Sequence, residues 1–218
     1  MSLSLLRPRV IRNVRDGAGV LAAPGDYDQV LEEAVRRYGR ARPRRWVADV
    51  AGDGGFDYAL PAGAAAVAQV EYPAGQREPV LVDSLDWTLY DAPEGTALRF
   101  RSSTPAVGET VRLTVTGEHS IAEASTSVPS ADHDIVVLIA SSLACEQLSS
   151  HYTNQGDSTI GADSVDHKSK GAEYAHRAKR FMSLVPEPFR SLEEGEVQAA
   201  GGEVSYGEDV FLLTHRQR

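Results

Sequence analysis

The sequence predicts an α+β fold: a helical body, an inserted small antiparallel β module of the sandwich or barrel kind, and extended terminal arms. The evidence is a change of period along the chain. Apolar residues recur every three or four positions at 26–40, alternate with polar residues over about 46–121, and return to helical spacing at 132–154 and 168–182. The 218 residues, 42% of them hydrophobic, can bury one full core but hardly two large ones. We therefore expect an arm at 1–25, one domain at 26–185 and a second arm at 186–218.

The N-terminal segment 1–25 is predicted to be an extended arm, because Pro8, Pro24 and several glycines interrupt its Arg and Val residues. A helix follows at 26–40. Asp26 is placed to cap its start, and Gly39 is placed to stop it. The apolar residues that recur at helical spacing between them are Val30, Leu31, Ala34, Val35 and Tyr38.

Six short runs rich in Val, Leu, Thr and aromatic residues make up the β module between Trp46 and Ile121. The separators between them are rich in Gly and Pro, which is typical of tight turns. The stretch AGDGG at 51–55 lies between two such runs, so we interpret it as a hairpin turn and not as a phosphate-binding loop. The stretch VRLTVTG at 111–117 alternates apolar and polar residues, which predicts one buried and one solvated face.

The segment 132–154 predicts the strongest helix of the chain. Its first half is apolar almost all round, which implies burial on more than one side. The last helix, at 168–182, has a narrow apolar face and is ended by the two prolines of VPEPF. The residues expected to pack on the strongest helix are Tyr174, Ala178 and Phe181.

The C-terminal arm is acidic and rich in glycine, which predicts a flexible segment. It holds few large apolar side chains until one strand-like run near its end. We expect this run to dock onto a neighbouring molecule by strand addition. Its residues are Val210, Phe211, Leu212 and Leu213.

Charge is distributed unevenly along the chain. The net charge of -9 argues against a general nucleic-acid binder, which needs clustered Lys and Arg. Residues 1–45 carry ten Arg and five acids, residues 46–167 carry four Arg and eighteen acids, and residues 168–180 carry five cations and one acid. Blocks of opposite charge suit copies of the chain that bind each other, or acidic and basic partners stacked above and below it. The alternative is that the basic block at 168–180 is a solvated flank of the last helix. The candidate partner-binding residues of the last helix are Lys170, Tyr174, Arg177, Lys179 and Arg180.

The sequence contains no established catalytic motif: no G-x-S-x-G elbow, H-E-x-x-H, P-loop or dinucleotide fingerprint is present. Asp132, His133 and Asp134 resemble a metal-binding cluster, but their place ahead of a helix favours a capping role. Cys145 lies in an apolar helical stretch and is interpreted as a buried structural thiol. The six histidines lack the i, i+3 or i+4 spacing of a local zinc site. We therefore expect no enzymatic activity, cofactor or metal.

Three short motifs follow each other within residues 26–185. A Y-x-L-P step enters the β module, a strand that ends just before His leaves it, and an S-V-D-x-x-x-K run precedes a helix with Tyr and an A-K/R-R step. In this order they resemble the head-to-tail adaptor proteins of tailed bacteriophages, also called connector or neck proteins. The matching residues are Tyr58, Leu60 and Pro61; Thr116, Gly117, Glu118 and His119; and Ser164, Val165, Asp166, Lys170, Tyr174, Ala178, Lys179 and Arg180.

The resemblance implies a non-enzymatic structural protein of the virion neck, assembled in the host cytoplasm. It implies a ring, twelvefold to match a portal, that binds the portal protein and a tail, tail-completion or stopper protein. DNA would pass through the lumen without sequence-specific binding. An acidic β module suits such a conduit, because a surface that repels phosphate does not trap the genome. No membrane role is expected, since no apolar run approaches the ~20 residues needed to span a bilayer.

A second hypothesis comes from a different class of protein, a β-sandwich module of a phage tail that binds carbohydrate or a receptor. Its stacking platform would be formed by Trp46, Trp87 and Tyr90. A weaker alternative is a metal hydrolase built on Asp132, His133 and Asp134. Observation of rings would distinguish the adaptor from the binding module, and a measurement of bound metal would test the hydrolase.

Overall fold

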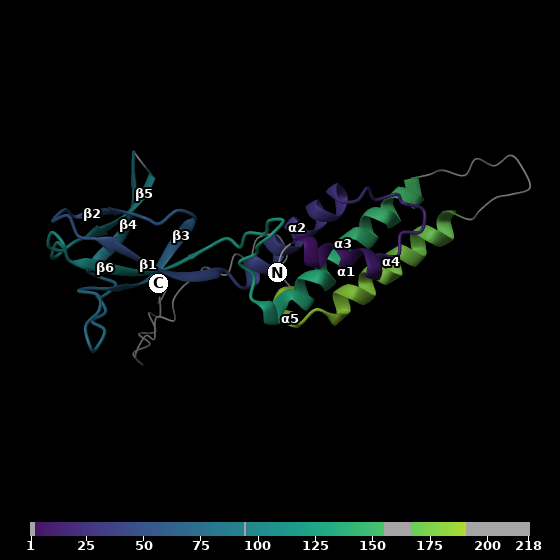
Figure 1. Cartoon of the computed structure of the whole chain (residues 1–218). Coiled ribbons are helices and arrows are strands. Elements are labelled where there is room, and N and C mark those ends of the chain that lie inside the picture. Colours follow the sequence, from purple (N-terminus) through teal and green to yellow (C-terminus); the bar gives the residue numbers. More distant parts are fainter. Residues whose placement is uncertain (1–2, 94, 155–166, 191–218) are drawn as a thin grey trace, which may run out of the picture.

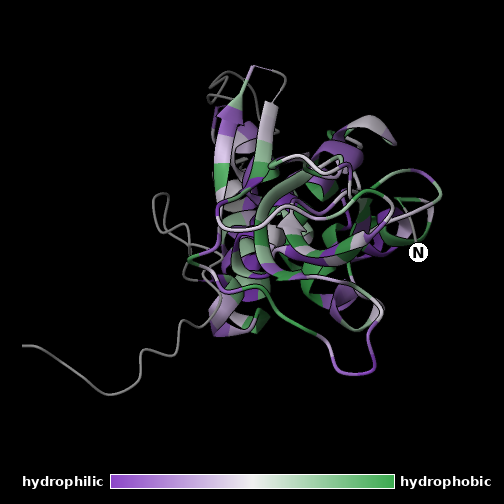
Figure 2. Cartoon of the chain, turned by 90° about the vertical axis from the view of Figure 1, so that its left-hand side faces the viewer, coloured by the Kyte–Doolittle hydropathy of each residue, from purple (hydrophilic) through white to green (hydrophobic). Residues whose placement is uncertain are grey.

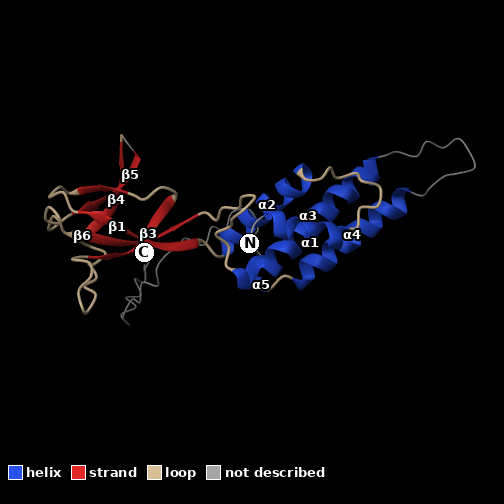
Figure 3. Ribbon diagram, in the orientation of Figure 1, coloured by secondary structure: helices blue, strands red, loops and turns tan. Residues whose placement is uncertain are grey.

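The computed structural model describes residues 3–93, 95–154 and 167–190. Its helices form a body at one end of the molecule and its strands form a β module at the other (Figure 1, Figure 3). The β module is inserted between the second and third helices, so the predicted α+β class is confirmed. In chain order the elements are α1 (Leu3–Val14), α2 (Gly25–Ala41), β1 (Arg44–Ala51), β2 (Asp57–Ala59), β3 (Ala64–Glu71), β4 (Trp87–Ala92), β5 (Gly95–Phe100), β6 (Thr110–Gly117), the 3-10 turn η1 (Ser130–Asp132), α3 (His133–Asn154), α4 (His167–Leu184) and α5 (Glu187–Arg190).

Helix α3 is the centre of the helical body, and it packs against α1, α2 and α4. Burial on more than one side, predicted from its apolar first half, is confirmed. Two buried serines satisfy their hydroxyls with backbone carbonyls: Ser141 donates to Val137 O at 2.7 Å and Ser142 donates to Ala178 O at 3.0 Å. Cys145 is fully buried, and burial raises the pKa of its thiol to about 11. The interpretation of Cys145 as a structural thiol is therefore supported, because such a thiol stays protonated and inaccessible.

The prediction of an extended N-terminal arm is wrong for Leu3–Val14, which form α1. Leu6, Val10 and Val14 recur every four residues, so they share one helix face, and all three are fully buried in the body. The prediction gave more weight to the prolines and glycines of the segment than to this short pattern. Pro8 lies inside α1, on its exposed side.

Helix α2 occupies almost the predicted range, but its ends differ from the prediction. Gly39 does not stop the helix, which continues to Ala41 and closes when the Arg42 amide donates to Tyr38 O at 3.0 Å. Pro43 follows, and it cannot continue a helix. Asp26 lies in the first turn and accepts a hydrogen bond from the Ala22 amide instead of capping the helix.

The β module consists of two three-stranded antiparallel sheets, ordered β1-β6-β3 and β2-β5-β4, with a shared apolar core. The predicted alternation in β6 is confirmed: Val111, Leu113 and Val115 are fully buried, and the residues between them face outward. Figure 2 looks onto this end of the molecule and shows hydrophobic and hydrophilic stretches alternating along the strands. The prediction of a hairpin at 51–55 is wrong, because β1 and β2 are not paired and belong to different sheets; the segment is a connection between the two sheets. A Cβ on Gly52 in this connection would come within 2.4 Å of Ala106 O.

The body and the β module are joined through the end of α2. The Tyr38 hydroxyl and the Arg42 guanidinium both donate to Asp132 Oδ2, at 2.5 and 2.6 Å. The Tyr38 ring also contacts His119 and stacks on Phe189, each with ring centroids 5.2 Å apart. These five residues, which we call the junction cluster, connect α2, the end of β6, η1 and α5.

Candidate interaction surfaces

Helix α4 is fixed on α3 by the apolar face predicted for it. The Tyr174 ring stacks on Tyr152 with centroids 5.7 Å apart, Ala178 is buried, and Phe181 is half-buried against the same core. The expected packing of Tyr174, Ala178 and Phe181 on α3 is therefore confirmed. The loop before α4, 155–166, lies outside the described residues.

Two of the candidate partner-binding residues on α4 make contacts inside the chain. Tyr174 is buried, so its ring contributes to the core and offers little surface to a partner. The Arg177 guanidinium donates to Asn13 O at 2.8 Å and to Val14 O at 2.6 Å, the last carbonyls of α1. A cation at a helix C-terminus offsets the partial negative charge of the unpaired carbonyls. Local sequence spacing cannot predict this contact, because it joins residues more than 160 positions apart and requires a helix at Leu3–Val14 that was not predicted.

The other cations of α4 differ in exposure. Lys170 is half-buried, and its ammonium lies 5.6 Å from the centroid of the Tyr152 ring, within the range of a cation–π contact. Lys179 and Arg180 are exposed, and within the described residues no carboxylate forms an ion pair with either side chain. We call Lys179 and Arg180 the α4 basic pair. The candidate segment Val210–Leu213 lies outside the described residues.

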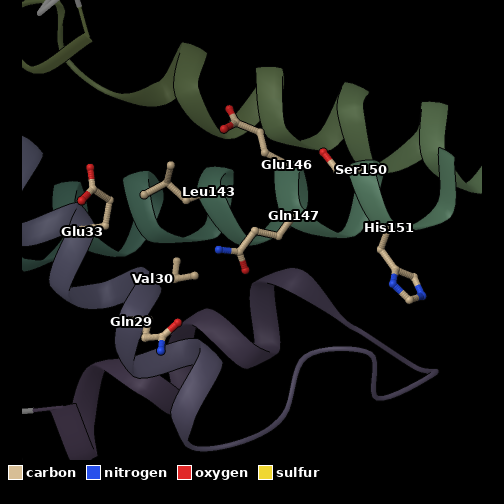
Figure 4. Close-up of a pocket in the computed structure, with 8 residues that line it drawn as sticks. All are labelled: Gln29, Val30, Glu33, Leu143, Glu146, Gln147, Ser150 and His151. Atoms are coloured by element: carbon tan, nitrogen blue, oxygen red, sulfur yellow. The ribbon is translucent and has the colours of Figure 1, made fainter. Parts of the chain in front are cut away.

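A groove of about 490 Å³ lies between α2 and α3 (Figure 4). Glu33 and Glu146 both line it. Glu33 is neutralised in part by ion pairs with Arg36 and Arg37, whereas Glu146 is exposed and has no ion pair within the described part of the chain. The remaining lining residues are Gln29, Val30, Leu143, Gln147, Ser150 and His151.

A second groove, of about 630 Å³, lies at the junction of the body and the β module. One wall is the outer face of α2, and the other is formed by the start of β3 and the end of β6 with the residues that follow it. Burial lowers the pKa of His119, which lies in this groove, below its ordinary value. We call this the junction groove. The sequence interpretation missed it, because nothing in a single sequence shows that α2 passes beside the end of β6.

Asp132, His133 and Asp134 do not converge on a shared site. Asp132 accepts from Tyr38 and Arg42, an imidazole nitrogen of His133 lies 3.1 Å from Val128 O, and Asp134 pairs with Arg9. The 3-10 turn η1 that precedes α3 has no side-chain cap. Among the described residues no group of three or more His, Cys, Asp or Glu side chains has an arrangement that suits a metal ion.

The aromatic platform of the alternative hypothesis is not formed in the described fold. Trp46 on β1 and Trp87 on β4 belong to different sheets, and both pack against the core of the β module. The Arg99 guanidinium lies 4.1 Å from the centroid of the Tyr90 ring and covers one of its faces. The structure therefore does not favour carbohydrate stacking on these three rings.

Large apolar side chains are exposed in the loops of the β module. Val107 in the β5–β6 loop is 78% exposed and Leu85 in the β3–β4 loop is 76% exposed. Single exposed apolar residues are common on protein surfaces. Phe56, Val80 and Leu81 are exposed in the same module, in its turns and loops.

The chain was compared with known proteins of three kinds. No protein-family model and no curated protein matches it. Among solved structures it is similar to a chain in the neck of an empty GTA particle computed with C6 symmetry, with 17% identity over 78% of this chain and 88% of that chain and a TM-score of 0.32. It is also similar to a chain in the virion of a native gene transfer agent (GTA) particle, with 16% identity over 80% of this chain and 88% of that chain and a TM-score of 0.30. A third similar chain lies in the neck of a native GTA particle computed with C12 symmetry, with 17% identity over 80% of this chain and 92% of that chain and a TM-score of 0.28. At these TM-scores the likeness carries no argument about function. Within the described residues no helix is long and apolar enough to cross a bilayer.

Proposed function

We propose that this chain is a structural neck protein of a tailed bacteriophage or a related particle. Its copies form a ring of twelve beneath the portal, join the capsid to the tail or a tail-completion protein, and leave a channel for DNA. The motif order within residues 26–185 supports this role, because helix, β module, buried helix and final helix follow each other in the folded chain as they do in the sequence resemblance.

The charge arrangement of the helical body is the observation that carries the proposal. A closed ring needs a heterologous contact, in which two different patches of the same chain meet. Helix α4 exposes the basic pair Lys179 and Arg180, and the groove between α2 and α3 exposes Glu146. Glu146 lies on α3, and the basic pair lies on α4, which packs against α3. Unpaired charges of opposite sign on one chain allow a head-to-tail contact, in which the basic pair of one copy meets Glu146 of the next.

The acidic character of the β module supports a channel for DNA. Its Arg99 and Arg112 are paired with Asp57 and Asp49. Other acids of the module have no ion pair within the described residues, and they accept hydrogen bonds from amides or hydroxyls instead. A surface with this balance repels phosphate and lets DNA slide past. These acids are Asp53, Asp83, Asp86 and Asp91.

Charge reversal of the α4 basic pair tests the assembly surface. We expect Lys179→Glu/Arg180→Glu to leave the melting temperature unchanged, because both side chains are exposed. Association into rings or onto the portal should weaken, most visibly at low salt, because exposed pairs contribute only about 0.2–1 kcal/mol each and are screened by ions. Mass photometry over a salt series measures this.

The matched control is Arg77→Glu/Arg101→Glu, which changes the net charge equally at two exposed positions of the β module. It should assemble like the unmodified chain. Adding Glu146→Lys to the α4 variant identifies the partner: recovery of rings indicates that α4 meets the α2–α3 groove of the next copy. Normal assembly of the α4 variant at both low and high salt would show that α4 is only a solvated flank.

A further inference from the structure

The junction groove has the shape of a docking site for an apolar segment. Ala65 and Ala66 of β3 and Ile121 beyond β6 contribute apolar surface to it. Its volume of about 630 Å³ lies within the range of about 300–1,000 Å³ that is usual for binding pockets.

Two glycines line the groove. A Cβ on Gly39 would have His119 Cδ2 as its nearest neighbour, at 3.7 Å, so an alanine fits there at ordinary contact distance, whereas a much larger side chain would extend into the groove. A Cβ on Gly117 would lie 2.2 Å from Gly63 O, so packing requires glycine there. Packing therefore does not require glycine at position 39. A glycine there also makes the helix less stable than an alanine would.

The rim of the groove is charged. Arg36 and Arg40 stand one helical turn apart on α2, and Arg40 has no carboxylate partner within the described ranges. Glu118 lies on the opposite wall and is exposed. A segment with an apolar centre, an acidic residue on one side and a basic residue on the other would match this arrangement.

We propose that the junction groove receives the C-terminal segment of this chain, with Val210–Leu213 on its apolar floor. The run VFLL is the one place after Arg190 where four large apolar residues are consecutive, and Glu208 and Asp209 precede it while His215 and Arg216 follow it. The acids suit Arg40, and the basic residues suit Glu118. The segment therefore offers acidic residues, then an apolar run, then basic residues, to match Arg40, the apolar floor and Glu118 of the groove.

The described chain ends close to the groove. The Phe189 ring is stacked on Tyr38, and Tyr38 is adjacent in sequence to Gly39, which lines the groove. Nineteen residues, 191–209, connect Arg190 to Val210. A chain extends by at most about 3.3–3.6 Å per residue, so this connection reaches the groove of the same copy or of a neighbour. Docking of this segment within one copy does not require a ring.

Engineered cysteines test the docking in the full-length chain. Ala65→Cys/Leu212→Cys places one thiol in the groove and one in the segment, and Val107→Cys/Leu212→Cys is the control with a well-exposed partner in a β-module loop. The native Cys145 is buried and gives little background. We expect the 65–212 disulfide to form on the order of tenfold faster than the 107–212 disulfide, because docking raises the effective concentration of the two thiols.

Filling the groove provides a second test. Gly39→Leu added to the 65–212 pair should reduce the rate to that of the control pair, whereas Gly39→Ala should preserve most of the rate, provided that both variants melt like the parent. A disulfide within one chain or between chains supports the docking, and gel mobility distinguishes the two. Equal rates for the 65–212 and 107–212 pairs would overturn the proposal, even if the protein forms rings.

Discussion

At the scale of single residues, charged groups that look available in the sequence are used inside the fold. Asp132 was interpreted as a helix cap, and it receives hydrogen bonds from Tyr38 and Arg42, which join the end of α2 to η1. Arg177 was assigned to a partner surface and instead holds the end of α1. Both roles depend on contacts over 90 residues or more along the chain, so local spacing could not predict them.

Arg177 should contribute to folding stability, unlike its neighbour Arg180. Arg177→Ala removes two charge-assisted hydrogen bonds to the last carbonyls of α1, and we expect it to lower the free energy of unfolding by about 1.5–3 kcal/mol. Arg180→Ala, at an exposed position on the same helix, should change it by less than about 0.5 kcal/mol. Urea denaturation measures both. Equal effects would mean that Arg177 is solvated in the same way as Arg180.

His119 should make stability depend on pH. Its Nε2 lies 2.9 Å from Arg42 O, which can only accept, and its Nδ1 lies 3.1 Å from the Ser127 hydroxyl. Because burial lowers the folded-state pKa below 6.5, the unfolded chain binds more protons between that lower pKa and 6.5. The free energy of unfolding therefore rises with pH in this window and falls as the pH drops through it.

The substitution His119→Gln removes the titrating group and isolates this effect. We expect the unmodified chain to lose more stability than the variant between about pH 7 and pH 5, because the other groups titrate in both. Chemical denaturation at a series of pH values gives the comparison. Parallel stability profiles for the two chains would be inconsistent with a depressed pKa at His119.

At the scale of elements, strong periodic signals were reliable and weak ones were not. The helix now seen as α2, the alternation in β6 and the burial of α3 were predicted because each has a long or regular hydrophobic pattern. Helix α1 was missed because it is short and contains a proline, although Leu6, Val10 and Val14 form a regular stripe. Tertiary burial of that stripe outweighs the local penalty.

Pro8 should therefore be a destabilising residue. An interior proline lacks the amide hydrogen that an α-helix uses and costs up to about 3 kcal/mol. Since Pro8 is exposed, we expect Pro8→Ala to raise the free energy of unfolding by about 1–3 kcal/mol. Thermal denaturation followed by circular dichroism would measure it. A variant that is less stable than the parent would indicate that α1 is not helical in solution.

At the scale of the whole molecule, the junction cluster lies between a helical core and a sheet core, and the junction groove lies beside it. The two-part architecture followed from the sequence, because the period of hydrophobicity changes where the fold changes. The candidate surfaces followed only in part. Lys179 and Arg180 are exposed as expected, but the grooves arise from the packing of elements whose relative positions no local pattern contains.

The central claim is that copies of this chain assemble into a neck ring, and imaging the full-length protein mixed with its portal protein tests it most directly. Electron microscopy should show closed rings with a central channel, twelvefold and stacked coaxially on the portal. Subunits that remain monomeric beside intact portal rings, at every protein concentration and at low as well as high salt, would contradict the account.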